Sequence, residues 1–243
     1  MQIQKVLFHK GKCFYVRDLD RDFHTQFGFI KKEDLRKSKE TVKSNTDREF
    51  YIFIPSFIDS YKKIKRVPQI IPLKDIAAIV AETGINKASV VVDAGAGSGA
   101  LACFLANICK RVITYEIRKD FVEVVKKNKE DLNLKNLTIK NKDIYEKIDE
   151  KNIDLITLDL PEPWKVIKNT DGALKIGGFL VSYSPTIPQV GDFINEINKN
   201  DNFHHIKTIE IIEREWDIEG RKLRPKSQPI GHSGFISFVR KIK

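Results

Sequence analysis

The sequence predicts an α/β protein: a doubly wound, mostly parallel sheet with a reversed C-terminal edge strand, preceded by a small all-β module. Two changes of pattern along the chain indicate this division. Up to about residue 58, aromatic and β-branched residues alternate with polar ones in period two, as in short half-buried strands. From about residue 73, apolar runs alternate with amphipathic stretches, which is typical of a parallel sheet covered by helices. We expect an N-terminal β-module over residues 1–60 and a second domain over residues 61–243.

The N-terminal module carries strand-like segments that are separated by charged turn sequences. These segments are Lys5–His9, Lys12–Val16, Phe23–Ile30 and Phe50–Pro55. We expect them to form a small barrel or a curled sheet. A basic connector, Ser60–Arg66, follows them and leads to Pro68.

The second domain alternates helices and strands until its last two strands, which have no helix between them. Gly84 follows the first helix, where a glycine can take the left-handed conformation of a C-cap. The last two strands predict an antiparallel hairpin, so that the sheet ends in a reversed edge strand. The expected helices are Asp75–Thr83, Ala100–Cys109, Asp120–Leu132 and 188–199, and the expected strands are Ser89–Asp93, Arg111–Ile117, Leu137–Asp143, Asp154–Leu160, Phe179–Tyr183, His204–Glu213 and Gly234–Lys241.

The charge of the chain is unevenly placed. The 243 residues carry a formal net charge of +10, with 31% charged and 41% hydrophobic residues, as in a globular protein. Residues 1–66 hold 16 Lys and Arg against 9 Asp and Glu, whereas residues 67–243 hold 27 against 24. The first quarter of the chain is basic, whereas the charges of the rest nearly balance. This distribution indicates a surface for a polyanion such as a nucleic acid. The alternative is that the lysine-rich segments are only solvated faces.

Neither membrane insertion nor metal binding is expected. No apolar run approaches the roughly 20 residues that span a bilayer, and the N-terminal sequence lacks the apolar core of a signal peptide. We therefore expect a cytoplasmic protein. Cys13, Cys103 and Cys109 form no CxxC pair and no metal-binding pattern with the five histidines. Buried thiols are expected, with disulfides between subunits as the alternative.

A glycine-rich segment, Asp93–Gly99, lies between the first strand and the first following helix of the α/β region. Glycines there allow a tight turn and bring backbone amides and a helix N-terminus close to a ligand. Glu116 ends the next strand, where its carboxylate can accept hydrogen bonds from both hydroxyls of a ribose. Asp143 ends the third strand and is placed to meet an adenine edge. The GxGxG spacing, without a following Lys-Ser/Thr, argues against a phosphate-binding P-loop.

This set of residues resembles the S-adenosylmethionine (SAM) pocket of class I methyltransferases. The resemblance implies SAM as the cofactor and a terminal antiparallel pair of strands. The cofactor-binding residues that we expect from it are Gln69, Asp93, Gly95, Ala96, Gly97, Ser98, Gly99, Ala100, Leu101, Glu116, Ile117, Asp143, Ile144 and Asp159.

Asp159 is the candidate catalytic residue. It begins the segment Asp159–Trp164, which follows the fourth strand at the edge where such sheets hold their reacting groups. Pro161 and Pro163 fix the backbone of this segment. A carboxylate there can accept a hydrogen bond from the exocyclic amine of an adenine and stabilise the cation that forms when ring nitrogen N1 takes a methyl group. Trp164 either stacks on that base or packs against the sheet.

Several short motifs are spread along the second domain. They are Arg66–Ile71, Lys74-Asp75, Asp93–Leu101, Tyr115–Arg118, Asp159–Trp164, Ser184–Thr186 with Gln189, Arg224–Lys226 and Gly231–Phe235. Together these motifs resemble those of the archaeal and bacterial tRNA (adenine-N1)-methyltransferase family. The resemblance implies a homotetramer that methylates an adenosine of the tRNA T-loop, at tRNA position 58 and in some archaea also at 57. The chain departs from the family pattern at Pro72 and Leu73, where a His or Tyr followed by Pro is common, so the choice of nucleotide is open.

Two further residues are candidates for contact with the substrate. His232 could touch the target base or a phosphate, although such a histidine is often a hydrogen-bonded structural group. Arg224 belongs to a basic cluster with Arg221, Lys222 and Lys226 that could meet phosphates, or could be a solvated loop.

Two other functions stay open on sequence grounds. One is a class I methyltransferase of a small molecule, such as a corrinoid precursor, which the basic N-terminal module disfavours. The other is a non-catalytic RNA-binding subunit with the same fold. The intact glycine segment, Glu116 and Asp159 argue against a subunit without a working site.

Overall fold

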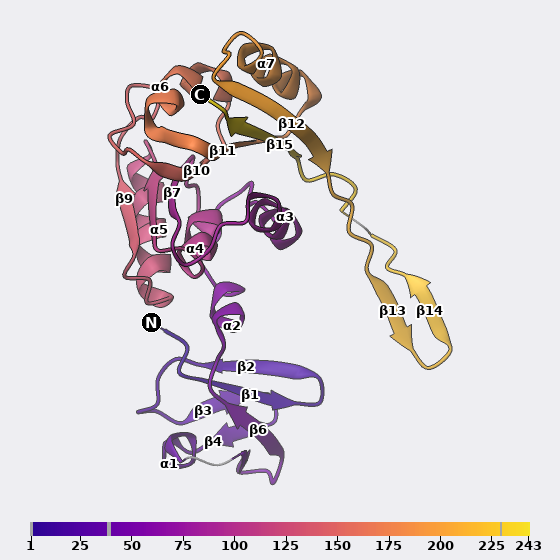
Figure 1. The fold of residues 1–243 in the computed structure, drawn as a ribbon. Coiled ribbons are helices and arrows are strands. Elements are labelled where there is room, and N and C mark those ends of the chain that lie inside the picture. Colours follow the sequence, from indigo (N-terminus) through magenta and orange to yellow (C-terminus); the bar gives the residue numbers. More distant parts are fainter. Residues whose placement is uncertain (1, 38–39, 229) are drawn as a thin grey trace. The chain divides into compact units, whose positions relative to one another are not determined.

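The structure, a computed structural model, describes residues 2–37, 40–228 and 230–243. The chain divides into two compact units (Figure 1). Each unit has its own hydrophobic core. The smaller unit comprises Met1–Lys65 together with Lys127–Asn133, and the larger unit comprises Arg66–Lys126 together with Leu134–Lys243. No helix in the described ranges is both long and apolar enough to cross a membrane.

The smaller unit is built on a four-stranded antiparallel sheet. Side chains alternate between the two faces of each strand, and one face buries Leu7, Phe50 and Ile52 in the core of this unit. Two short helices, α1 (Lys32–Arg36) and α2 (Phe57–Tyr61), complete it. The strands follow the order β2-β1-β6-β5 across the sheet, with the bounds Lys12–Val16, Lys5–His9, Glu49–Phe53 and Thr41–Lys43.

The single strand expected over Phe23–Ile30 is wrong, because this segment forms a hairpin. Its strands are β3 (Phe23–Thr25) and β4 (Gly28–Ile30). Gly28 makes the turn possible: its φ is 96°, and a Cβ at this position would lie 2.4 Å from Oδ1 of Asn45. The period-two pattern runs through the turn, so it did not reveal the reversal of the chain.

The larger unit is an α/β sheet, which confirms the predicted mostly parallel architecture preceded by a small antiparallel β-unit, although α1 and α2 were not expected in that unit. Strand β7 lies near the middle, and it is parallel to β8 on one side and to β10 on the other. Its β-branched residues Val91 and Val92 are fully buried, as expected for a strand covered on both faces. The strand order is β12-β15-β11-β10-β7-β8-β9, with the bounds Phe203–Glu210, Phe235–Lys241, Leu174–Ser184, Ile153–Leu158, Val90–Ala94, Arg111–Tyr115 and Leu137–Lys140.

One detail of the prediction needs correction: the reversed strand is not at the edge. Strand β15 is antiparallel to both of its neighbours, because it forms ladders with β11 and with β12. The last strand therefore inserts between them and leaves β12 outermost. The long connection from β12 to β15 makes this return possible. It contains an unexpected hairpin of β13 (Trp216–Glu219) and β14 (Lys222–Pro225), which projects beyond the ends of β12 and β15 (Figure 1).

The helices agree with the expected ones except between β10 and β11. There the chain forms a 3-10 turn (Pro163–Val166) and a helix that the sequence pattern did not indicate. The predicted C-cap at Gly84 is confirmed, since its φ is 63° and its N–H donates to the carbonyl of Val80. The α-helices of this unit are α3 (Leu73–Thr83), α4 (Ala100–Ala106), α5 (Lys119–Asp131, whose last turn belongs to the smaller unit), α6 (Ile167–Ala173) and α7 (Ile187–Ile197).

Strand register brings three distant parts of the chain together at one edge of the sheet. Ala94 of β7 lies opposite Tyr115 of β8 and Leu158 of β10. The next residue along each of these parallel strands therefore emerges at the same edge. These three residues are Gly95, Glu116 and Asp159, so the sheet itself aligns the glycine segment with the two carboxylates.

Candidate active site

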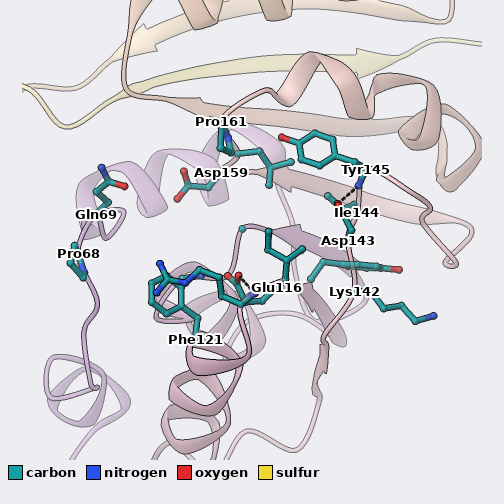
Figure 2. Close-up of a pocket in the computed structure, with 16 residues that line it drawn as sticks. Pro68, Gln69, Glu116, Phe121, Lys142, Asp143, Ile144, Tyr145, Asp159 and Pro161 are labelled. Atoms are coloured by element: carbon teal, nitrogen blue, oxygen red, sulfur yellow. Dashed lines mark hydrogen bonds between the residues drawn. The ribbon is translucent and has the colours of Figure 1, made fainter.

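A cavity of about 320 Å³ opens at this edge of the sheet (Figure 2). Figure 2 shows the side chains of Asp159 and Glu116 directed into it from the ends of β10 and β8, the two strands that flank β7, with Gln69 at one side and Tyr145 at the other. Its lining residues are Pro68, Gln69, Gly95, Gly97, Tyr115, Glu116, Ile117, Arg118, Phe121, Lys142, Asp143, Ile144, Tyr145, Asp159, Leu160 and Pro161.

The three glycines of the loop serve three different purposes. A Cβ on Gly95 would lie 1.9 Å from the carbonyl oxygen of Asp159, so this glycine lets two strand ends approach closely. A Cβ on Gly99 would lie 2.7 Å from Val125, so this glycine allows the start of α4 to pack against α5. A Cβ on Gly97 would meet only Val67, at 3.8 Å. Gly97 is therefore the glycine whose missing side chain leaves room for a ligand.

Glu116 is held in place by two backbone amides. Its Oε2 accepts a hydrogen bond from the N–H of Gly97 at 3.0 Å, and its Oε1 accepts one from the N–H of Arg118 at 2.9 Å. The side chain is only 7% exposed. Each carboxylate oxygen has a second lone pair, so both can accept one more hydrogen bond from the cavity side. This arrangement suits the two adjacent hydroxyls of a ribose.

Asp93 is buried beneath the glycine segment, at 2% exposure. Its two oxygens accept hydrogen bonds from the hydroxyl groups of Thr114 on β8, at 2.6 Å, and Thr157 on β10, at 2.8 Å. Burial raises its pKa. Both threonines alternate with apolar residues inside their strands, so the sequence pattern gave no sign of this pairing. Asp93 therefore ties three strands together at the point where the loop leaves the sheet.

A smaller hollow, lined largely by the glycine segment, adjoins the main cavity. Gln69 and Asp159 line both, and Gln69 has a positive φ of 62°, which turns the chain sharply at this place. Of the expected cofactor residues, Gly99 lines neither space. The residues around the hollow are Gln69, Ile70, Ile71, Asp93, Gly95, Ala96, Gly97, Ser98, Ala100, Leu101 and Asp159.

The end of the main cavity that Ile117, Asp143 and Ile144 line is suited to a flat, partly polar ring. Ile117 and Ile144 supply apolar walls there. Oδ1 of Asp143 accepts a hydrogen bond from the N–H of Tyr145 at 2.8 Å, which fixes the carboxylate at the rim (Figure 2). An aspartate held in this way can accept from an exocyclic amine.

Asp159 has the properties of a functional carboxylate. Its backbone N–H donates to the carbonyl of Ala94 at 2.9 Å, which continues the sheet pairing by one residue. Burial, together with the nearby charges of Asp93 and Glu116, raises the pKa of its side chain to about 7. A carboxyl group whose pKa is raised by burial and by like charges, in a cavity, is a strong candidate for a functional residue.

Asp159→Asn should stabilise the folded protein more at pH 8 than at pH 5. The folded chain holds a proton on Asp159 up to about pH 7, whereas an unfolded chain loses it near pH 4. The contribution of Asp159 to the free energy of unfolding is therefore present at low pH and is lost as the pH rises toward 7. Asparagine does not titrate, so we expect a gain on the order of 2–4 kcal/mol at pH 8. Chemical unfolding of the parent and of Asp159→Asn at both pH values measures this gain. If the two proteins differ in free energy of unfolding by the same amount at pH 5 and at pH 8, the raised pKa is contradicted.

The structure does not bring the three expected substrate residues into this cavity. Trp164 packs against the large hydrophobic core from the 3-10 turn. Arg224 lies on the exposed hairpin, in β14. Nε2 of His232 donates to the carbonyl of Pro185 at 2.9 Å, and its Nδ1 lies 2.6 Å from a carboxylate oxygen of Glu210, which raises the pKa of the imidazole. These contacts favour the structural alternatives for His232 and Trp164.

Sequence reasoning missed a buried polar network beside the site. Asp75, with no exposed surface, accepts hydrogen bonds from Tyr183 at 3.0 Å and Ser233 at 2.8 Å, and pairs with Lys74 at 2.7 Å. A Cβ on Gly234 would lie 2.5 Å from the Tyr183 ring, so a glycine is needed there. The network ties α3 to β11 and to the segment before β15. Lys74, Asp75, Ser233 and Gly234 occur in the motifs named above and Tyr183 ends an expected strand, but a separation of up to 159 residues concealed their contact.

The comparisons of this chain with known proteins all lead to methyltransferases. Residues 62–233 match the model of a family described as the tRNA methyltransferase complex GCD14 subunit. A protein of Methanocaldococcus jannaschii, the tRNA (adenine(57)-N(1)/adenine(58)-N(1))-methyltransferase TrmI, is 35% identical over 95% of this chain and 92% of its own length.

Two solved structures share the whole architecture. The tRNA (m1A58) methyltransferase TrmI of Aquifex aeolicus superimposes with a TM-score of 0.82 at 26% identity, covering 99% of this chain and 97% of that one. A protein of Thermotoga maritima, described as a SAM-dependent O-methyltransferase, superimposes with a TM-score of 0.86 at 30% identity, covering 99% and 93%. These similarities confirm the class I methyltransferase fold.

Proposed function

Because the chain belongs to the tRNA methyltransferase family described by the GCD14 model, we propose that it transfers a methyl group from SAM to N1 of an adenosine in the T-loop of tRNA. The target is tRNA position 58, and position 57 is a second candidate, as in the name of the Methanocaldococcus relative. The observation that carries the proposal is the alignment of Gly95, Glu116 and Asp159 at one sheet edge by strand register.

The main cavity is suited to SAM. Glu116 binds the ribose hydroxyls with its two remaining acceptor positions, and Gly97 lets the ligand approach the backbone. Ile117, Asp143 and Ile144 surround the adenine ring of the cofactor. When bound, SAM supplies an electrophilic methyl group. Asp93 acts by holding the loop, since both of its oxygens are bonded to threonines.

Asp159 acts on the target base. N1 of a neutral adenine already has a lone pair, so no base is needed to make it nucleophilic. Positive charge develops on the ring as N1 takes the methyl group, and the Asp159 carboxylate, accepting from the exocyclic amine, stabilises that charge. A carboxylate that is partly desolvated interacts more strongly with a developing charge than one in bulk water. The target base must leave its place in the folded tRNA to reach this position.

The N-terminal β-module, residues 1–60, contacts the tRNA, and residues 61–243 form the catalytic domain. The excess of basic over acidic side chains in residues 1–66 supports these two roles. Lysines that meet phosphates position the tRNA without selecting the base. Lys62, Lys63 and Lys65 are exposed at the end of this region, so they are available for such contacts.

Reversal of these lysines should weaken tRNA binding. Each phosphate contact that is lost lowers the slope of log K against log salt concentration by about 1, so replacement of Lys62, Lys63 and Lys65 by Glu should flatten the slope by up to about 3. SAM affinity should not change. Titration of tRNA at several salt concentrations measures the slope. An unchanged slope would show that this segment is a solvated linker.

We also propose a cytoplasmic homotetramer. The hairpin β13–β14 supports assembly through the larger unit: Trp216, Ile218 and Leu223 are 54%, 76% and 64% exposed on it. A two-stranded hairpin is marginal by itself in water, and contact with another subunit would bury these side chains. Light scattering at several protein concentrations tests the tetramer.

Incubation of the protein with an unmodified tRNA transcript and methyl-labelled SAM tests the proposed reaction. N1-methyladenosine in the digested RNA is the expected product. The description of the Thermotoga relative as an O-methyltransferase makes a ribose O-methyl product the informative alternative. A non-catalytic subunit would bind tRNA without transferring label, and a small-molecule enzyme would neither bind nor label tRNA.

A further inference from the structure

The sheet of the smaller unit carries aromatic side chains on the face that does not form its core. Along β1 and β6, Leu7, Phe50 and Ile52 point into the core, and the residues between them point the other way. The outward side chains of Phe8, Tyr51 and Phe53 are 36%, 59% and 42% exposed. Exposed aromatic residues side by side are unusual on a sheet that is not bound to anything.

Strand register places these rings next to one another. Tyr51 lies opposite Phe8, and Phe8 lies opposite Cys13, so one row of side chains crosses three strands. Neighbouring side chains in such a row are about 4.5–5.5 Å apart at Cβ. The next row on the same face contains Phe53 and Tyr15, both opposite Val6. Val6 is fully buried and Tyr15 is partly buried, so this row is open only on the side of Phe53. We call this surface the aromatic platform; its exposed members are Phe8, Tyr51 and Phe53, and Tyr15 lies at its border.

Positive charge adjoins the aromatic platform. Nζ of Lys63 lies 4.5 Å from the centre of the Tyr15 ring, and the exposed Lys43 extends from β5 on the same face. Glu49 lies opposite Lys43, so the face is not uniformly basic. The excess of basic residues over the whole of residues 1–66 nevertheless favours a polyanion over an apolar protein surface.

We propose that the aromatic platform stacks unpaired nucleobases of the tRNA substrate while neighbouring lysines meet its phosphates; this rests on the proposed tRNA function. Sheet faces that combine exposed aromatic rings with basic side chains bind single-stranded RNA, because every base offers a flat face for stacking. Removal of a base from a folded T-loop breaks stacking inside the tRNA. A platform that stacks displaced bases offsets part of that cost.

The expectation of a buried thiol is wrong for Cys13, which is exposed and lies opposite Phe8. It therefore provides a direct probe. Cys103 and Cys109 are internal controls: they are 0% and 5% exposed, and burial raises the pKa of their thiols to about 12 and about 11. Alkylation of the full-length protein with N-ethylmaleimide, followed by mass spectrometry, should modify Cys13 first. An unmodified tRNA transcript should slow this reaction in proportion to the fraction of protein bound.

Substitutions at Tyr51 separate stacking from other contacts. Tyr51→Leu keeps an apolar side chain but removes the ring, and it should weaken tRNA binding about 5- to 150-fold. Tyr51→Phe keeps the ring and should bind like the parent. Both should retain the parent's salt slope, since no phosphate contact is lost. Ile176→Ala, which changes a 69% exposed apolar residue of the other unit, is the matched control and should bind normally.

Three outcomes would overturn the proposal. Two of them require that the parent methylates tRNA: equal tRNA affinity of Tyr51→Leu and parent, or Cys13 alkylation that saturating tRNA does not slow. The third is protection of Cys13 that rises with protein concentration in the absence of RNA, which would make this face a contact between subunits. A parent that neither binds nor methylates tRNA would refute the proposed function itself, and the stacking role with it.

Discussion

Asp159→Ala should lower the single-turnover rate of tRNA methylation about 10²- to 10³-fold, with SAM and tRNA affinities close to those of the parent. The reason is that removal of one preorganised electrostatic partner of a transition-state charge typically costs this much in rate. The carboxylate stabilises the charged ring more than the neutral one, so its loss appears in the chemical step. Rates at saturating SAM and tRNA measure the effect.

A further variant tests whether the negative charge of Asp159 is responsible for the rate of methyl transfer. Asp159→Asn keeps the size and one acceptor, so its rate should fall between those of Asp159→Ala and the parent. Because the pKa of Asp159 is raised to about 7, kcat/KM of the parent should rise with pH up to about 7 and then level off, whereas the Asn variant should lack this step. Glu162→Ala is the matched control, since its carboxylate pairs with Lys165 at 2.6 Å. Equal rates for Asp159→Ala and the parent would make Asp159 a structural residue.

Glu116→Ala should weaken SAM binding by about 1.5–3 kcal/mol, which is about 10- to 150-fold in Kd. The variant loses the acceptor of the ribose hydroxyls and also leaves the N–H groups of Gly97 and Arg118 without their partner. Calorimetric titration with SAM measures the loss. Glu123→Ala, an exposed acid on α5 that pairs with Lys126, should bind SAM normally.

Gly97→Val gives an independent test of the same pocket. A Cβ at Gly97 meets no protein atom closer than 3.8 Å, so the branched side chain should occupy ligand space rather than disrupt packing. The φ of 54° makes the substitution strained, so a thermal melt must accompany the titration. If Glu116→Ala and Gly97→Val both fold and both bind SAM as tightly as the parent, the cofactor assignment is refuted. Gly95 is unsuitable for this test, because its Cβ would collide with the Asp159 backbone.

Local signals in the sequence predicted the parts of the site that lie at strand ends. The β-branched run before Asp93, the glycines after it and the acids that close the next strands were sufficient to place Glu116 and Asp159 at one edge. Strand register then determined which residues meet, and register depends on the packing of whole strands rather than on any one of them. This is why the threonine partners of Asp93 were not foreseen.

Features that depend on long-range packing were not predictable in this way. The final strand of the sheet inserts beside β11 instead of lying at the edge, and a period-two pattern is the same in either place. The pairing of His232 with Glu210 and the Pro185 carbonyl joins segments 22 and 47 residues apart. For Trp164 the sequence left two roles open, stacking on the target base and packing against the sheet, and the structure shows the partly buried ring packed against the core.

Nucleotide-resolution mapping of N1-methyladenosine tests both the proposed reaction and the role of Asp159. An unmodified tRNA transcript is incubated with SAM and either the parent or Asp159→Ala, and the methylated positions are read from reverse-transcription errors. We expect a signal at tRNA position 58, with or without a second at 57, that is at least about 100-fold slower to appear with the variant. Absence of N1-methyladenosine with the folded parent, or methylation confined to a ribose oxygen, would contradict it.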